Sequence, residues 1–434
     1  MKNAFGKIFA TAAAIAIVLL AAFLPAEIKT ARAFSDKADE IASERIFGDQ
    51  KSCLTVCYSG RTTTYTDEEI AAPDHEAEYE IHENKINSGH REKAALVKQR
   101  VKCGLSKKCA LVASYPLLPA FFEKISREIE RLPKDSEITF LPGGQPKFII
   151  TREKNGIKAD ERAFYSDVFA AWQRSPTAVI TLKTEQIPPA VTAADNKKQT
   201  FLKARFCTDY SRSGKNRKHN VELAMQKTDG TELSDGESFS FNKTVGRRSG
   251  ENGFYEAKII VGGEYVDGLG GGVCQASTTL YNAALLAGMN VDEAGSHTLA
   301  PSYVAPSFDA AVSYGSRDLK FTNCSGGRVF IHTYCSGGKA IAEFYGVENK
   351  YHIVRKSVVV SQGEAPEDKI IIDEEGKYFA PDAEEGSMMR IRGGSASLVS
   401  EGYLLYYESG KCVKTRKIRS DKYMPVRGIL VKKP

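Results

Sequence analysis

A cysteine in this chain has neighbours that could give it chemistry. The stretch GLGGGVCQASTTLYNAALLAG, residues 268–288, puts Cys274 after a run of glycines and at the start of a helix-like segment. A cysteine at a helix N-terminus lies beside free backbone N–H groups and the positive end of the helix dipole, and both favour the thiolate. The same N–H groups could stabilise an oxyanion. The pattern therefore indicates that Cys274 is a candidate catalytic nucleophile.

Cysteine catalysis also needs a base, and His297 is the leading candidate. It follows the cysteine by 23 residues, beyond a helix that we predict to end at Gly288. A helix of ~13 residues followed by a returning strand can bring such a position back beside the helix start. Asp309 or Asp318 could orient the imidazole, and Gln275 could donate a hydrogen bond to an oxyanion.

The glycines in front of the cysteine have two interpretations, which the residues alone leave open. Gly270, Gly271 and Gly272 would let a substrate backbone come close, so we count them as candidate substrate-binding residues. Glycines before a helix are equally typical of close backbone packing, and a buried free cysteine then behaves as a small hydrophobic residue. A phosphate-binding loop is excluded, because the Walker lysine and the GxGxxG spacing are both missing.

The first 33 residues are typical of an export signal. Lys2 and Lys7 precede 17 nearly uncharged residues, 8–24, and the small-residue pattern Ala-Arg-Ala follows at 31–33. A positive start, an apolar stretch and small residues at a cleavage site mark a secretory signal. A stretch of this length also reaches the lower limit of about 17 residues for a membrane span. We therefore predict an extracytoplasmic protein, either secreted or anchored to the cytoplasmic membrane through residues 1–33.

Nine cysteines in an exported chain raise the question of disulfide bonds. Three pairs lie close in sequence: Cys53 with Cys57, Cys103 with Cys109, and Cys324 with Cys335. Each pair could form a short-range bridge, and the odd total leaves at least one cysteine unpaired or bonded to another molecule. No CxxC pair or histidine cluster has the spacing of metal ligands, so we expect neither a metal site nor a cofactor.

The net charge of +6 does not indicate a nucleic-acid-binding protein, because no basic stripe accompanies a nucleic-acid-binding motif. Charge is unevenly distributed toward the C-terminus. Residues 364–385 hold nine acidic side chains against two lysines, whereas residues 411–434 hold nine Lys or Arg against one acid. The basic tail suits anionic cell-wall polymers or a membrane surface, or it is a solvated edge strand.

Length and local patterns predict a multi-domain α+β protein. A chain of 434 residues is long enough for two or three domains of ~150 residues. Residues 34–115 form a polar, cysteine-containing region to which we assign no function, and residues 116–190 form a small α+β module. Residues 200–350 form a mixed core that holds the candidate site. Residues 351–434 combine an acidic linker with a basic, β-rich tail.

Residues 200–346 resemble the VanW family, which is related to an accessory product of vancomycin-resistance clusters. The resemblance rests on ESFSFNKTVGRRSGENGFYEAKIIVGGEYVDGLGGGVCQASTTLYNAALLAG and on SHTLAPSYVAPSFDAAVSYGSRDLKFTN. Six residues match family counterparts: Cys274, Gln275, Tyr281, His297, Tyr303 and Asp309. Residues 118–190 resemble a peptidoglycan-binding domain that often precedes the VanW domain, and residues 402–428 resemble a short β-segment that often ends such proteins.

Two positions depart from the family pattern. An arginine that commonly follows the helix, in an E-R-x-x-H-like context, is missing from the stretch DEAGSH. A Pro-Gly pair before an Asp-Ala pair is replaced by Pro306 and Ser307, with Phe308 inserted before Asp309. Any role of that arginine must be absent or supplied elsewhere, and the backbone role of the glycine is open.

The resemblance implies an envelope protein that acts on or near peptidoglycan or another cell-wall polymer. The first hypothesis is Cys-dependent acyl or peptide chemistry on the wall, carried by the catalytic candidates Cys274, His297, Asp309 and Gln275. Tyr281 and Tyr303 join the glycines as substrate-binding candidates. The alternatives are a non-catalytic peptidoglycan-binding or scaffolding protein and an accessory protein of vancomycin resistance.

Overall fold

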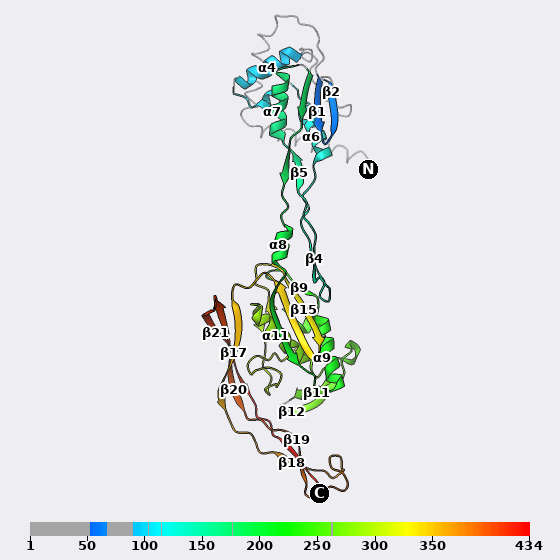
Figure 1. The fold of residues 1–434 in the computed structure, drawn as a ribbon, viewed down its shortest axis with the longest axis vertical. Helices are drawn as coiled ribbons and strands as arrows, with labels where there is room; N and C mark the ends of the chain where they lie inside the picture. The colour runs from blue at the N-terminus through cyan, green and yellow to red at the C-terminus, as the bar shows by residue number, and fades with distance from the viewer. Residues whose placement is uncertain (1–52, 67–89, 103, 114, 176, 262–263) are drawn as a thin grey trace, which may run out of the picture. The chain divides into compact units, whose positions relative to one another are not determined.

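The computed structural model describes residues 53–434 apart from 67–89, 103, 114, 176 and 262–263 (Figure 1). The predicted signal or anchor segment, residues 1–33, lies outside the described residues. None of the described helices is long and apolar enough to cross a membrane. Contacts divide the chain into two compact units: residues up to 135 with 153–190, and residues 136–152 with 191–434. Both units mix helices with small sheets, which confirms the predicted multi-domain α+β class.

The first unit is built on a three-stranded sheet in the order β2–β1–β6, in which β1 runs antiparallel to β2 and parallel to β6. Its elements are β1 (Cys53–Tyr58), β2 (Arg61–Thr66), α4 (His90–Lys102), α5 (Lys107–Val112), α6 (Leu118–Ile129), β5 (Gly156–Ala159), α7 (Glu161–Trp172), β6 (Thr177–Thr181) and β7 (Thr184–Ile187). Leu54 and Val56 of β1 share one core with Ile125 of α6 and Ile180 of β6. Residues on both sides of position 116 therefore fold together.

All eight cysteines in the described part of the chain are free thiols, so no disulfide bond joins Cys53 to Cys57 or Cys324 to Cys335. Cys53 and Cys57 lie on one strand, four residues apart. Their Cα atoms are therefore separated by about 13 Å, at ~3.3 Å per residue. A disulfide requires Cα atoms ~4.4–6.8 Å apart. Cys324 and Cys335 are also free, and Cys103 lies outside the described residues.

The second unit is organised around an antiparallel four-stranded sheet in the order β8–β16–β15–β9. These strands are β8 (Phe201–Asp209), β9 (Thr231–Leu233), β15 (Val329–Ser336) and β16 (Lys339–Gly346), and the helices α9 (Lys215–Thr228) and α11 (Val273–Leu286) pack on them. Ile331 and Phe344 join the core with the helices. Because side chains alternate along a strand, Phe330 and Tyr345 point to the other face. There they contact Phe140 in the hairpin β3 (Ile138–Phe140) and β4 (Phe148–Ile150).

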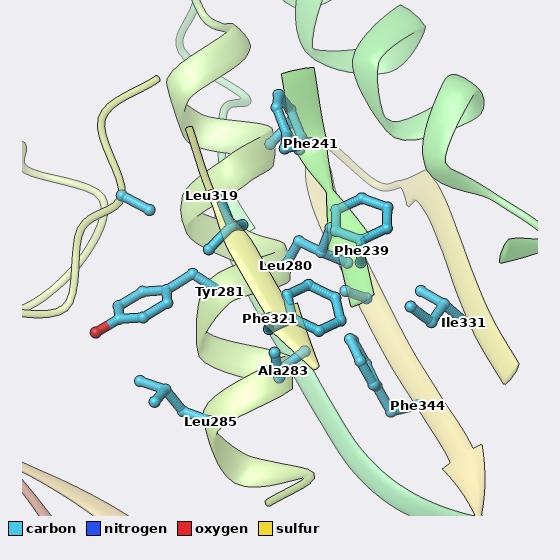
Figure 2. Close-up of a cluster of buried hydrophobic side chains, with 14 of the residues drawn as sticks. Phe239, Phe241, Leu280, Tyr281, Ala283, Leu285, Leu319, Phe321, Ile331 and Phe344 are labelled. Atoms are coloured by element: carbon cyan, nitrogen blue, oxygen red, sulfur yellow. The ribbon is translucent and has the colours of Figure 1, made fainter. Parts of the chain in front are cut away.

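Helix α11 lies at the centre of this core and carries the predicted nucleophile in its first turn. Apolar side chains surround the helix. Figure 2 shows Leu280 facing a group that includes Phe321, while Tyr281 points away on another side of the helix. Such burial fixes the position of the helix by packing. The helix predicted after the glycine run is thus confirmed, and it begins at Val273.

The remaining elements of the second unit's core supply loops and strands around this helix. They are α8 (Ala193–Lys198), β10 (Ser238–Ser240), α10 (Phe241–Val245), the 3-10 helix η1 (Gly250–Asn252), β11 (Glu256–Val261), β12 (Glu264–Leu269), β13 (Asn290–Glu293) and β14 (Lys320–Thr322). Strands β10, β14 and β13 form a small antiparallel sheet. Strands β11 and β12 pair antiparallel immediately before the glycine run.

The C-terminal segment forms two three-stranded sheets. The first consists of β17 (His352–Gln362), β20 (Leu398–Glu408) and β21 (Lys411–Tyr423), and the second of β18 (Lys369–Ile372), β22 (Ile429–Lys432) and β19 (Met388–Arg392). The basic tail begins as the edge strand β21, whose residues 411–417 are exposed. This confirms that much of the positive charge lies on a solvated edge strand.

Candidate functional site

The start of α11 presents a backbone donor at the predicted nucleophile. Gly272 adopts a left-handed conformation with a φ of 108°, and the helix begins at the next residue, so Cys274 is its second residue. The neighbouring N–H groups of Val273 and Gln275 donate to Gly270 O and Gly272 O at 3.0 and 2.9 Å. Within the described residues the N–H of Cys274 has no such acceptor, as expected in the first turn of a helix.

The three glycines allow close packing, and two of them also line a cavity. A Cβ at Gly270 would lie 2.7 Å from Arg248 Cγ, and a Cβ at Gly272 would lie 2.9 Å from Arg217 Cγ. Gly271 is buried against another backbone segment, whereas Gly270 and Gly272 line the cavity at the helix start. A substrate in the cavity could therefore contact Gly270 and Gly272, but it could not reach Gly271.

We expect Gly271→Ala to destabilise the second unit by ~1–3 kcal/mol, the usual cost of overpacking. A Cβ there would lie 2.7 Å from the carbonyl group of Ala257 and from Lys258 O, and backbone atoms cannot rotate away. The thermal midpoint of the purified variant should fall. Gly393→Ala, at an exposed position with open space around the Cβ, should leave the midpoint unchanged. An unchanged midpoint for Gly271→Ala would contradict the steric clash.

His297 and Asp309 come together beside Cys274. Asp309 is fully buried, and its Oδ2 accepts hydrogen bonds from His297 N at 2.6 Å and from His297 Nδ1 at 2.7 Å. With Nδ1 occupied, the ring has Nε2 left for its hydrogen bond with the Cys274 thiol. The sulfur also lies 3.4 Å from Val312 O and accepts from Val312 N at 3.5 Å. A thiol, an imidazole and a carboxylate that orients the imidazole are thus assembled.

The charges in this group favour the thiolate. Burial by itself raises the pKa of the Cys274 thiol. Four opposing effects outweigh burial and lower the pKa of the Cys274 thiol. They are the hydrogen bond and the charge of His297, the hydrogen bond from the Val312 N–H, and the charge of Arg248. Burial likewise opposes the imidazolium, yet hydrogen bonds to Asp309 and Cys274 raise the pKa of His297 to about 9. Both shifts favour the thiolate–imidazolium form of the pair over the neutral thiol and imidazole.

This ion pair predicts an unusual pH dependence for the alkylation of Cys274. The rate for an ordinary thiol, with a pKa of ~8.5, falls about tenfold per pH unit below that value. A lowered pKa keeps more of the thiolate populated at lower pH, so the rate of iodoacetamide modification should fall by clearly less than tenfold from about pH 8 to pH 7. The measurement is mass spectrometry of the peptide that contains Cys274.

The matched control for that profile is His297→Gln, which removes the imidazolium but keeps a polar side chain. The variant should show the steep fall of an ordinary thiol, because the pKa of Cys274 rises when the cation is lost. A steep fall in the wild-type protein would contradict the ion pair.

The C-terminal strand β21 holds the carboxylate of this group in place. Asp309 Oδ1 accepts from Arg419 Nη2 at 2.6 Å and from Tyr423 OH at 2.7 Å. Arg419 also donates through Nε to Asp421 Oδ2 at 2.7 Å. Burial raises the pKa of Asp309, but the hydrogen bonds from His297 and the charge of Arg419 outweigh it and hold that pKa below its usual range. The carboxylate therefore stays ionised beside the imidazole.

Sequence reasoning did not find Arg419 and Tyr423, which are 110 and 114 residues from Asp309 along the chain. A signal was present, because Arg419, Asp421 and Tyr423 alternate along a strand and share one face. The alternation indicates that this face of the strand meets a polar partner. It does not tell which element of the chain supplies that partner.

A cavity of about 1140 Å³ opens at the start of α11. Cys274, His297 and Tyr303 line it. Six cationic side chains also line it: Arg212, Arg217, Arg247, Arg248, Lys258 and Arg317. Asp209 is the one acidic side chain among the described lining residues. The cavity around the thiolate therefore carries a strong excess of positive charge.

Comparison with known proteins identifies the family. The family model described as VanW like protein matches residues 216–345. A Bacillus subtilis (strain 168) protein described as uncharacterized protein YoaR is 30% identical over 220 residues, which cover 49% of this chain and 68% of the relative. The chain belongs to the VanW family. This membership supports a cell-wall-associated protein, and the matched range includes Cys274, His297 and Asp309 but ends before β21.

Two solved structures also show limited similarity. The crystal structure of HP0197-G5 has a TM-score of 0.11 and 18% identity, and the match covers 19% of this chain and 99% of that chain. The IgA1 protease G5 domain structure has a TM-score of 0.12 and 16% identity, with coverage of 20% and 94%. TM-scores this low carry no inference about fold or function.

Within the VanW domain, the structure gives Gln275 and Asp318 roles other than the predicted ones. Gln275 Nε2 donates to Asp209 O at 2.8 Å and to Thr208 Oγ1 at 3.1 Å, so both of its amide protons are used to tie α11 to β8. Its side chain is therefore not a free oxyanion donor. Asp318 accepts from Asn242 N at 2.8 Å at the start of α10 and does not orient the imidazole.

The two predicted tyrosines of the VanW domain differ in their surroundings. Tyr303 lines the cavity. Burial, with the nearby charge of Cys274, raises the pKa of Tyr303, so its phenol stays protonated. Tyr281 is buried, and its ring centroid lies 5.6 Å from the guanidinium carbon of Arg419. Tyr281 therefore packs against the arginine that holds Asp309 and does not line the cavity.

Ser307 is one of the residues at which this sequence departs from the pattern that the resemblance led us to expect. Its φ is 63°, in the left-handed region that favours glycine. The residue is fully buried, its N–H donates to Tyr423 OH at 2.7 Å, and its hydroxyl lies 2.7 Å from Ser400 Oγ. The backbone conformation is thus kept by a serine, whose hydrogen bonds connect the Asp309 loop to β20 and β21.

Proposed function

We propose that this VanW-family protein is an exported enzyme of the cell wall, in which Cys274 performs acyl or peptide chemistry on peptidoglycan. The observation that carries the proposal is the arrangement of Cys274, His297 and Asp309 at the edge of a large cavity. Cysteine acyl-transfer enzymes need a thiolate, a base in contact with it and a group that orients the base. Cys274, His297 and Asp309 are the described side chains that would meet these three requirements.

The reaction would begin with attack of the Cys274 thiolate on a carbonyl carbon of a stem peptide. The carbonyl π electrons move to oxygen, and the N–H of Cys274 would donate to that oxyanion. Collapse of the tetrahedral intermediate breaks the C–N bond, and the His297 imidazolium gives its proton to the leaving amine. A thioester and a neutral imidazole remain. Water or an amine then attacks the thioester, His297 takes its proton, and the thiolate is released.

Asp309 would keep the imidazole in the productive orientation throughout this cycle. Its bond to Nδ1 leaves Nε2 as the nitrogen that exchanges protons with the leaving group and the incoming nucleophile. The bonds from Arg419 and Tyr423 hold the carboxylate itself. These two residues would act as positioning residues, because neither lines the cavity.

The other parts of the chain would deliver this site to the wall. We infer that residues 1–33 export the protein or anchor it, and that residues 116–190 belong to a peptidoglycan-binding domain. The first unit's shared core supports treating residues 116–135 and 153–190 together with β1, β2 and α4 as one binding domain, whereas the β3–β4 hairpin, residues 136–152, belongs to the second unit. Peptidoglycan is then the expected partner of both units.

The proposal is tested by incubating the purified chain that begins at residue 34 with isolated peptidoglycan sacculi. Enzymatic digestion and mass spectrometry of the resulting muropeptides should show species that are absent from untreated sacculi. Binding of the protein to sacculi without any change in the muropeptides would contradict catalysis. That outcome would instead favour the non-catalytic binding function, for which the close packing of the glycine run provides some support.

A further inference from the structure

We propose that Arg217 and Arg248 form a carboxylate-binding pair beside Cys274, so that the acyl substrate carries a carboxylate close to the bond that reacts. The inference rests on the proposed function and adds the substrate class. It assigns specificity to two arginines that make no bond and transfer no proton in the proposed reaction.

The cavity holds more positive charge than its own acidic groups can balance. Of its six cationic side chains, Lys258 is paired with Asp267 at 2.9 Å. The five arginines form no ion pair with a carboxylate within the described residues. The lining Asp209 uses its Oδ1 to accept from the N–H and hydroxyl of Ser211. Guanidinium groups that have no carboxylate partner around a concave site attract an anion.

Two of these arginines lie against the glycine run that leads to the nucleophile. A Cβ at Gly270 would collide with the Arg248 side chain, and a Cβ at Gly272 would collide with that of Arg217. The absence of side chains at these positions therefore lets both arginines lie close to the loop before Cys274. The glycine run therefore holds the side-chain stems of two cavity-lining arginines against the loop before Cys274.

Both guanidinium groups keep donors for a ligand. Arg248 Nη1 donates to Gly246 O at 2.8 Å, while its Nη2 is buried without a partner among the described residues. Arg217 Nη1 donates to Ser213 Oγ at 2.6 Å, which leaves the rest of its guanidinium group without a protein acceptor in the described part of the chain. The planar fork of an arginine matches the two oxygens of a carboxylate. The charge of Arg248 also acts on the Cys274 sulfur, so the two groups are close.

The position of the pair indicates a carboxylate on the same residue as the reacting bond or on the next one. Cys274 attacks an acyl carbon under the proposed function, and a peptide places a carboxylate carbon three or four bonds from an amide carbonyl carbon, either at its C-terminus or on an acidic side chain. A peptide with a free carboxylate therefore satisfies the sulfur and the arginines together. A polyphosphate chain would meet the charge but offers no amide carbon to the sulfur.

The first test compares two alkylating agents of similar size, iodoacetate and iodoacetamide, on the full mature chain. Both react with the same thiolate, so their rate ratio at Cys274 is independent of the thiol pKa. Relative to free cysteine, the iodoacetate-to-iodoacetamide ratio should be raised roughly 10- to 100-fold, the range for a hydrogen bond to a charged group. Arg217→Gln and Arg248→Gln should each lower the ratio, and Arg248→Lys should retain part of it.

Arg416→Gln is the matched control, because Arg416 is exposed on β21 and does not line the cavity. It should leave the ratio unchanged, and thermal midpoints identify any variant that fails to fold. A wild-type ratio equal to that of free cysteine would overturn the carboxylate site. If Cys274 is inert to both reagents, that result contradicts its role as the nucleophile. The carboxylate site is then tested by the binding experiment described next.

The binding test uses Cys274→Ala, which cannot react, and calorimetry with a stem-type peptide as its free acid and as its C-terminal and side-chain amides. The free acid should bind roughly 10- to 100-fold more tightly than the amide form, and the difference should disappear in Cys274→Ala/Arg248→Gln. Equal affinities of acid and amide would overturn the inference. Binding of a glycerol-phosphate oligomer in preference to both peptides would overturn it in favour of a phosphate polymer.

Discussion

Replacing Cys274 with alanine is expected to abolish the wall-modifying activity while the protein stays folded. Removing the nucleophile of a triad should cost about 10³-fold or more in rate, because the remaining groups cannot form the thioester. The substitution removes one sulfur atom at the cavity wall, so the free energy of unfolding should change by only ~1 kcal/mol. Muropeptide release and thermal unfolding of the same sample measure the two effects.

The matched controls for this variant are Cys324→Ala and Cys412→Ala. Both residues are exposed free thiols outside the cavity, and each substitution should leave muropeptide release at the wild-type level. Full activity of Cys274→Ala would show that the sulfur is not the nucleophile. Loss of activity in all three variants would point to a general effect of cysteine removal.

The second large effect is expected for Asp309→Asn. The carboxylate accepts four hydrogen bonds, two from His297, one from Arg419 and one from Tyr423. An asparagine can accept through one oxygen only. Its NH₂ group must therefore face either the two donors of His297 or the donors of Arg419 and Tyr423, and those hydrogen bonds are lost. Loss of the correct imidazole orientation should lower activity by about 10⁴-fold. Breaking the buried contact with Arg419 should cost about 3–5 kcal/mol of unfolding free energy.

Alkylation of Cys274 gives an independent measure of Asp309→Asn. Without the carboxylate, the imidazolium loses its main stabilising partner, so the pKa of Cys274 should rise and the alkylation rate should fall steeply below about pH 8. Asp318→Asn is the matched control: its carboxylate is also buried and hydrogen-bonded, but to the start of α10. It should destabilise the fold and leave the pH profile of Cys274 alkylation the same as in the wild-type protein.

A wild-type pH profile and wild-type activity for Asp309→Asn would remove the carboxylate from the mechanism. If the variant is too unstable to purify, Tyr423→Phe provides a milder change. It removes one of the four hydrogen bonds to Asp309 and keeps the ring. A smaller shift of the alkylation profile in the same direction is then expected.

The sequence predicted the part of the site that lies close together along the chain. The glycine run, the helix start at Cys274 and the return of the chain to His297 are local features with strong signals, namely glycine spacing and helix periodicity. Asp309 was one of two candidates. The structure brings Asp309 to His297 and places Asp318 at a helix start instead.

The parts that could not be predicted depend on contacts between distant segments. Arg419 and Tyr423 reach Asp309 from a C-terminal strand, and strand alternation alone does not name the partner of a strand face. The parallel pairing of β1 with β6 joins Cys53 to Thr177 in register, across the boundary predicted at residue 116. The role of Gln275 was also hidden, because its amide partners Thr208 and Asp209 lie on another element.

The most direct test of the proposed mechanism is to trap the acyl-enzyme. The mature protein is mixed with soluble muropeptides, quenched in acid within seconds and analysed by intact-protein and peptide mass spectrometry. The mechanism predicts an added mass equal to an acyl fragment of the muropeptide, located on Cys274, labile to hydroxylamine and absent from Cys274→Ala. Muropeptides that bind the protein but leave Cys274 unmodified, while the wall is still processed, would contradict it.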